Sequence, residues 1–194
     1  WAARPPATPD ASANAALCAA MGIPTTSTAA DALSSVSVAV DAMLGTGQRA
    51  APRGTVLAGV RALRACGAPV AAMDLPTGLA ADTGQFLSED HVQAALTVTF
   101  GRHKPGLLCE PGATLCGEVV LIDIGLDLAR HCRPELLTPD ASILEPTDIS
   151  AWRPLRTPSD AKWDRGHVAI RAGGGAAVLT AHGAFRAGAG LVTL

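Results

Sequence analysis

Two aspartates in this sequence each follow a short apolar run and stand just before a glycine-containing turn. Asp41 is followed by Gly45-Thr46-Gly47, and Asp74 is followed by Pro76-Thr77-Gly78. A carboxylate at the end of a strand can hold a metal ion, orient a ribose or act as a general acid or base. The N–H groups of a glycine turn can bind phosphate. The alternative is that each aspartate only caps a helix or stabilises a turn.

Three basic side chains lie near these turns. Arg49 and Arg53 follow the first turn and could pair with a pyrophosphate, while Lys104 comes just after an apolar run and so belongs to the same side of a parallel sheet. Each of the three could equally be an ordinary solvated surface side chain. The glycine turn itself is neither a Walker loop nor a G-x-G-x-x-G fingerprint, so a dinucleotide-dependent dehydrogenase is disfavoured.

Alternating strand and helix patterns must position these residues. Between the first two predicted strands, Val56, Val60 and Leu63 have helical spacing, which gives a β-loop-α-β unit. We predict an α/β fold, a three-layer Rossmann-like sandwich with a mainly parallel sheet. Its strands are expected over residues 36–41, 70–74, 95–100 and 118–123.

The remainder of the chain differs in composition. Prolines recur between residues 130 and 160, which indicates a linker. After it, a strand at 168–170, a helix at 176–187 and a final strand predict a second β-α-β unit.

Composition excludes several classes of function. The 194 residues carry a formal net charge of −2 and no basic run, so we expect no nucleic-acid partner. No apolar segment approaches the roughly 18 residues that span a bilayer, so we expect no membrane partner. The five cysteines lack C-x-x-C spacing, which favours free thiols in a reducing, cytoplasmic compartment.

Four separate segments together resemble the NAD(P)H-hydrate epimerase domain of the YjeF N-terminal type. They are DAMLGTG at 41–47, MDLPTGLAADTG at 73–84, TVTFG with KPGL at 97–107, and GEVV with DIG at 117–125. The tail, KWDRGHV at 162–168 and GAGLVT at 188–193, resembles the opening of an ADP-dependent NAD(P)H-hydrate dehydratase, a ribokinase-like fold. The order is that of the bifunctional repair enzymes. The implied domains are an epimerase domain over 1–140, a linker over 141–160 and a dehydratase opening over 161–194.

The resemblance implies a role for each candidate residue. Asp41 and Thr77 are expected to bind potassium, although Thr77 stands where the family usually has serine. Asp74 is expected to contact the hydrated nicotinamide ring of the substrate, NAD(P)HX, and to act as the acid/base. The phosphates of the substrate are expected to lie against Gly45, Thr46, Gly47, Gln48, Arg49, Ala50 and Ala51. The dehydratase part implies ADP or ATP and Mg²⁺, and a homo-oligomer is left open.

The match to the family is incomplete at both ends. The family's Asn- and Gly-rich loop on the first strand has no counterpart here, the chain begins at Trp1, and Leu191–Leu194 ends it on an apolar run. We therefore expect an internal fragment with a sheet that is incomplete at its N-terminus. Epimerisation by this chain alone is expected to be weak or absent. The competing hypothesis is a non-catalytic nucleotide-binding fragment of the same fold.

Overall fold

The structure is a computed structural model that describes residues 6–127, 130, 132, 139, 141–152 and 157–194. Trp1 and residues 153–156 of the predicted linker lie outside this set. The chain divides into two compact units, Trp1–Ala141 and Ser142–Leu194, which are described separately.

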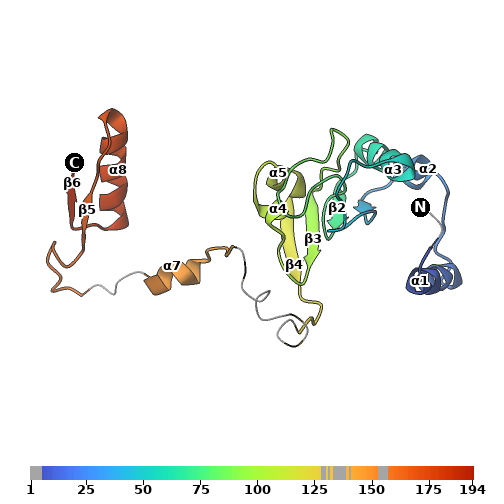
Figure 1. Cartoon of the computed structure of the whole chain (residues 1–194), viewed down its shortest axis with the longest axis horizontal. Helices are drawn as coiled ribbons and strands as arrows, with labels where there is room; N and C mark the ends of the chain where they lie inside the picture. Colours follow the sequence, from blue (N-terminus) through green and yellow to red (C-terminus); the bar gives the residue numbers. More distant parts are fainter. Residues whose placement is uncertain (1–5, 128–129, 131, 133–138, 140, 153–156) are drawn as a thin grey trace. The chain divides into compact units, whose positions relative to one another are not determined.

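A four-stranded parallel sheet forms the centre of the first unit (Figure 1). Its order is β1-β2-β3-β4, in which every neighbouring pair is parallel. The carboxyl ends of all four strands therefore lie at the same edge, and this confirms the α/β fold with a parallel sheet. The strands are β1 (Ala39–Asp41), β2 (Val70–Met73), β3 (Leu96–Phe100) and β4 (Glu118–Ile122).

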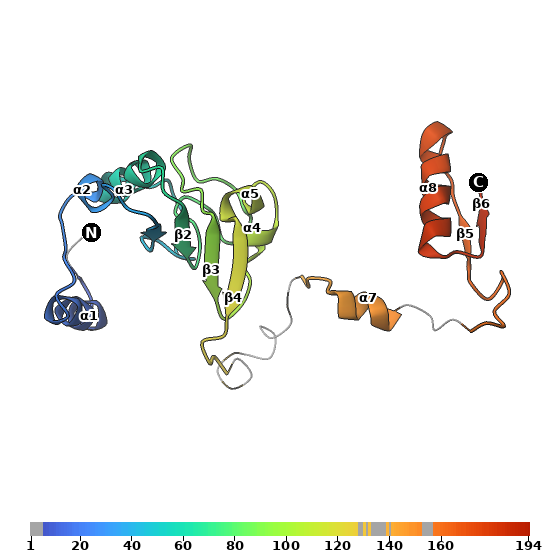
Figure 2. The same cartoon turned by 180° about the vertical axis from the view of Figure 1, so that it is seen from behind.

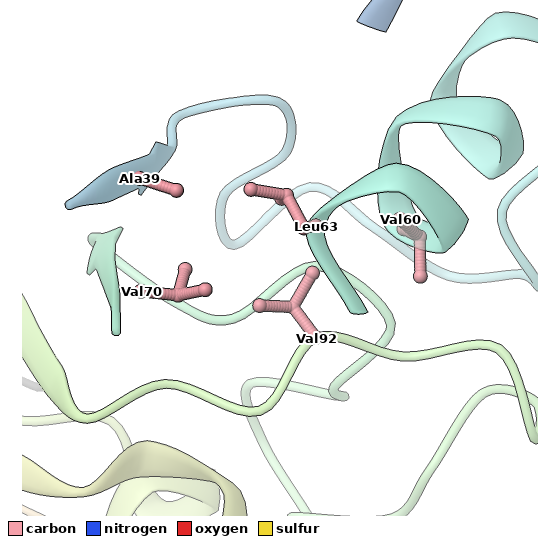
Figure 3. Close-up of a cluster of buried hydrophobic side chains, with 5 residues drawn as sticks. All are labelled: Ala39, Val60, Leu63, Val70 and Val92. Carbon is pink, nitrogen blue, oxygen red and sulfur yellow. The ribbon is translucent and has the colours of Figure 1, made fainter. Parts of the chain in front are cut away.

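Helix α3 (Gly54–Ala65) connects β1 to β2, as the apolar spacing predicts. Its buried side contributes to the first cluster of core side chains. Val60 and Leu63 on its buried side pack with Ala39, Val70 and Val92, and Figure 3 shows these five side chains between α3 and the two strands. Ala39 and Asp41 point to the same face of the sheet because side chains alternate along a strand. The packing of Ala39 therefore also orients Asp41 inward.

A second cluster fills the space beside β4. Leu75, Leu79 and Ala81, from the segment after β2, pack with Leu107 and Cys116. The last two belong to the short helices α4 (Pro105–Leu108) and α5 (Ala113–Cys116), which the sequence did not predict. Burial raises the pKa of the Cys116 thiol to about 11, so this side chain serves as packing and not as a nucleophile.

The first strand is shorter than predicted. A strand was expected over 36–41, but β1 begins at Ala39, where its ladder with β2 starts at the pair Ala39 and Val70. Ser35 has a φ of 60°, which turns the chain before the strand. Val38 lies before the ladder, because β2 begins at Val70 and offers it no partner. The prediction was therefore wrong for residues 36–38.

Two further helices precede this sheet, α1 (Pro9–Ala20) and α2 (Ala29–Ala32). The side-chain oxygen of Thr8 caps α1 by accepting a hydrogen bond from the Ala11 N–H (3.2 Å). None of the helices in the part of the chain that is described is long and apolar enough to cross a membrane.

The second unit contains the predicted β-α-β element. Strands β5 (His167–Ala169) and β6 (Leu191–Thr193) are parallel, and α8 (Gly174–Ala187) connects them (Figure 2). The stretch predicted as a linker also holds a short helix, α7 (Pro146–Trp152). Helix α8 ends at Gly188, which has a φ of 101°, a left-handed conformation that glycine adopts without strain.

Candidate functional site

Asp41 joins the end of β1 to the turn after β2. It is 1% exposed, and its carboxylate accepts hydrogen bonds from the Thr77 N–H (2.8 Å), the Thr77 hydroxyl (2.9 Å) and the Met43 N–H (3.2 Å). Burial is the largest influence and raises the pKa of Asp41, while the bonds from Thr77 and Met43 act in the opposite direction. Asp41 and Thr77, predicted as a pair from two separate motifs, are thus in direct contact.

Gln48 forms a second link between the two motifs. Its side-chain Nε2 donates to the Pro76 carbonyl (3.2 Å), and its Oε1 accepts from the Gly78 N–H (2.7 Å). The residue is 6% exposed, and its own N–H donates to the Gly45 carbonyl (3.2 Å). Gln48 was predicted to face the substrate phosphates. Its side chain points inward, where it holds the glycine turn against residues 76–78.

The other residues of the predicted phosphate loop lie at the surface or beside a cavity. The guanidinium of Arg49 donates to the carbonyls of Thr46 (2.8 Å) and Gln48 (3.1 Å), so it closes its own turn. Ala50 and Ala51 line a cavity of about 450 Å³ with Arg53 and the first residues of α3. The N–H groups of the first turn of a helix have no partner within the helix, and they attract anions.

Asp74 directly follows β2 in an unusual backbone conformation. Its φ of 70° lies in the left-handed region, which non-glycine residues rarely adopt and which is often found at functional sites. The Asp74 N–H donates to the Val98 carbonyl (2.7 Å), so the residue stays attached to β3. Its Oδ1 accepts from the Lys104 Nζ at 2.6 Å and from the Thr99 hydroxyl at 3.4 Å.

Lys104 is the residue for which sequence analysis left two alternatives open. The structure buries most of its side chain, which is 16% exposed, and pairs it with Asp74. The signal for this was its place in KPG, directly after a predicted strand. Thr99, which stands between the two charged groups, carried no signal beyond its inward position in the strand alternation.

The predicted phosphate loop and Asp74 meet at Gly45. A Cβ added at Gly45 would lie 3.1 Å from Oδ2 of Asp74, whereas one added at Gly47 would have no atom within 4 Å. Asp41, Thr77, Gln48, Gly45 and Asp74 therefore gather at the carboxyl edge of the sheet. Thr46, Arg49 and Ala50 lie on the exposed side of the same loop.

Two further observations delimit the site. Within the described residues, no three His, Cys, Asp or Glu side chains group as a metal site, so any ion here would need hydroxyl or carbonyl ligands as well. A second cavity, of about 460 Å³, includes Leu63, Arg64, Val70 and His91 in its lining and lies toward the amino ends of β2 and β3. None of the predicted site residues lines it.

Comparison with known proteins finds relatives whose names refer to the repair or epimerisation of NAD(P)H hydrate. A protein named bifunctional NAD(P)H-hydrate repair enzyme Nnr from Moorella thermoacetica is 37% identical over 174 residues, which is 84% of this chain and 31% of that protein. The protein of the same name from Escherichia coli strain K12 is 35% identical over 169 residues, 81% of this chain and 30% of that protein. A protein named NAD(P)H-hydrate epimerase from Clavibacter sepedonicus is 41% identical over 100 residues, 48% of this chain and 44% of that protein.

The chain spans less than a third of the length of the two bifunctional relatives. The family described as YjeF-related protein N-terminus matches residues 1–106, a range that contains Asp41, Thr77, Asp74, Lys104 and the whole of loop 45–51. With more than half of its residues matched, including this site, the chain belongs to the family of YjeF-related protein N-terminal domains.

Proposed function

We propose that this chain carries an epimerase site that interconverts the R and S forms of NAD(P)H hydrate at C6 of the nicotinamide ring. The names of the relatives support this substrate. The observation that carries the proposal is the placement of Asp74. It follows β2 in a left-handed conformation, with one carboxylate oxygen bonded to Lys104 and the other beside the Gly45 turn.

A carboxylate at this position suits the chemistry of the substrate. The C6 hydroxyl belongs to a hemiaminal, so the carboxylate can accept its proton while the C6–N1 bond breaks. The C–O bond then becomes a carbonyl and N1 receives the electron pair and a proton. Re-addition of N1 to the other face of the carbonyl, with return of the proton to oxygen, gives the opposite epimer. In a second route Asp74 protonates the hydroxyl, which leaves as water and re-adds from the other face.

General acid/base help of this kind typically accelerates a reaction about 10²–10⁴-fold. Both routes need a carboxyl group within hydrogen-bond distance of the C6 oxygen. Asp74 is the residue that we assign to this role, and Asp74→Asn is the variant that removes it with the smallest change in shape.

The phosphates of the substrate are assigned to loop 45–51 and the start of α3. The cavity there is lined by Ala50, Ala51 and Arg53, and the first turn of α3 adds free N–H groups. Gln48 is assigned to holding the loop in place and not to the ligand, because both ends of its amide are engaged with residues 76–78.

The Asp41–Thr77 pair fits potassium by the chemistry of its oxygen atoms. A carboxylate, a hydroxyl and the Thr77 carbonyl are the hard oxygen ligands that alkali cations prefer. The carbonyl of Thr77 accepts one hydrogen bond, from the Val92 N–H (2.8 Å), which leaves a second lone pair. Potassium held there would supply positive charge beside a carboxylate whose ionised form is disfavoured by burial.

Residues 161–194 are proposed to begin an ADP-dependent NAD(P)H-hydrate dehydratase domain, which would use ADP or ATP with Mg²⁺. The similarity to the bifunctional relatives supports this, because it covers 84% and 81% of the chain and therefore reaches beyond residue 106. In such a protein the epimerase would convert the R hydrate into the S form that the dehydratase repairs. The five cysteines, all free thiols, suit a cytoplasmic location.

One assay separates the proposal from its competitors. Mixed epimers of NADH hydrate are incubated with the chain and potassium, and their ratio is followed by chromatography. An epimerase accelerates equilibration, a nucleotide-binding module leaves the kinetics unchanged, and a dehydrogenase produces oxidised or reduced nicotinamide. Acceleration that persists undiminished in the Asp74→Asn variant would remove Asp74 from its assigned role.

A further inference from the structure

The ammonium group of Lys104 has three acceptors within the protein. Its Nζ lies 2.6 Å from Oδ1 of Asp74, 2.8 Å from the hydroxyl oxygen of Thr99 and 2.9 Å from the carbonyl oxygen of Phe100. A lysine ammonium carries three N–H donors and no acceptor. Each hydrogen therefore has a partner, and none is left for a phosphate or for the nicotinamide ring.

The two oxygens of the Asp74 carboxylate consequently differ. Oδ1 receives the short charge-assisted bond from Lys104 and a longer one from Thr99. Oδ2 receives no hydrogen bond from any described residue, and it faces the place where a side chain at Gly45 would begin. The carboxylate is thus held at one oxygen and available at the other.

Neighbouring groups hold the Lys104–Asp74 pair, which we call the anchor, in place. Thr99 is fully buried on β3, and the Phe100 carbonyl belongs to the same strand, so both acceptors are fixed by the sheet. The side chains of Lys104 and Asp74 are 16% and 22% exposed, which limits competition from water. Asp74 itself stands at a left-handed φ of 70°, a conformation that needs support from its neighbours.

We propose that Lys104 is a positioning residue for Asp74. It fixes Oδ1 so that Oδ2 is the oxygen that exchanges the proton with the substrate. The role of Oδ2 in proton exchange rests on the proposed function. The anchoring of Asp74 by Lys104 does not, because it can be measured without any substrate.

The anchor is tested by lysine labelling, for which the chain has a built-in control. Its two lysines are Lys104 and the exposed Lys162, whose Nζ lies over the Trp163 ring. Brief acetylation followed by mass spectrometry should modify Lys104 at least about tenfold more slowly than Lys162, since its hydrogen bonds must break first. In the Asp74→Asn variant the rate at Lys104 should rise several-fold, while Asp82→Asn, an exposed carboxylate, should leave it unchanged. Equal rates at both lysines in the unaltered chain would overturn the anchor.

The positioning role is tested by kinetics on the same chain. Lys104→Met should lower kcat for epimer equilibration about tenfold or more and change KM by less than about twofold, because orientation and not binding is lost. Lys162→Met is the matched control, and far-UV circular dichroism gives the folded fraction of each variant. An unchanged kcat, or a rise in KM alone, contradicts the role. The labelling experiment decides whether Lys104 anchors Asp74 whatever the epimerisation rate of the unaltered chain, so failure of the anchor and failure of the proposed function are distinguishable.

Discussion

Replacement of Gly45 by alanine should impair the reaction without unfolding the protein. The added Cβ would lie 3.1 Å from Oδ2 of Asp74, closer than the roughly 3.5–4.0 Å at which a methyl group makes an optimal contact. Lys104 holds the opposite oxygen at 2.6 Å, so the carboxylate cannot simply move away. Oδ2 must therefore rotate or shift by a few tenths of an ångström. A misplacement of about 1 Å costs about 10²-fold in rate, so we expect kcat to fall roughly three- to tenfold.

Gly47→Ala is the matched control in the same loop. No atom lies within 4 Å of the Cβ that it adds, and neither glycine has a φ in the left-handed region. Gly47→Ala should therefore gain about 0.4–1 kcal/mol from the less flexible unfolded chain. Gly45→Ala should gain less, because its Cβ presses on a carboxylate that Lys104 holds. Steady-state kinetics on mixed epimers, with urea unfolding of each variant, measures both effects. Equal kcat values for the two variants would refute the contact between Gly45 and the reacting oxygen.

Two further predictions concern the links between the motifs. Gln48→Leu should destabilise the loop by about 2–4 kcal/mol, because it leaves the Gly78 N–H and the Pro76 carbonyl buried without partners. Amide exchange at Gly78 measures this directly, and protection equal to that of the unaltered chain would contradict it. Burial raises the pKa of Asp41 above 3.8, so the folded state binds this proton more tightly than the unfolded state. The free energy of unfolding therefore decreases as pH rises through the raised pKa. Potassium should offset this loss, so its effect on Tm relative to choline should grow with pH and vanish in Asp41→Asn. A potassium effect that is independent of pH would count against this site.

Much of the sheet could be predicted from the sequence because its strands are short apolar runs that end in polar turns. The run before Asp74 is short and bounded by Pro69 and Pro76, which favours a strand, and Val56, Val60 and Leu63 have helical spacing. Residues 36–38 show the limit of such patterns. Val36 and Val38 flank Ser37 and so alternate like a strand, but their pairing depends on where β2 begins, and that is a property of the neighbouring strand. The short helices α4 and α5 are four residues each, too short to produce a periodic signal.

The candidate site was predictable in its location more than in its contacts. Asp41 and Asp74 were identified from their places at strand ends, and Thr77 from the resemblance to the epimerase domain. The parallel sheet then brings the strand ends to one edge. The directions in which these side chains point could not be predicted from the spacing of residues in the sequence. Gln48 turns inward because the Gly78 N–H needs an acceptor. Lys104 turns toward Asp74 because one oxygen after β2 and two oxygens of β3 lie together there. Both outcomes depend on contacts between segments far apart in the sequence.

We have proposed that this chain carries an NAD(P)H-hydrate epimerase site in which Asp74 moves the proton. The most direct measurement is the rate at which a purified epimer of NADH hydrate equilibrates, with the chain at a concentration close to that of the substrate and potassium present. We expect a rate above that of buffer alone, even if modest, and a return to the buffer rate in Asp74→Asn. Equal rates with and without the Asp74 carboxylate would contradict this assignment.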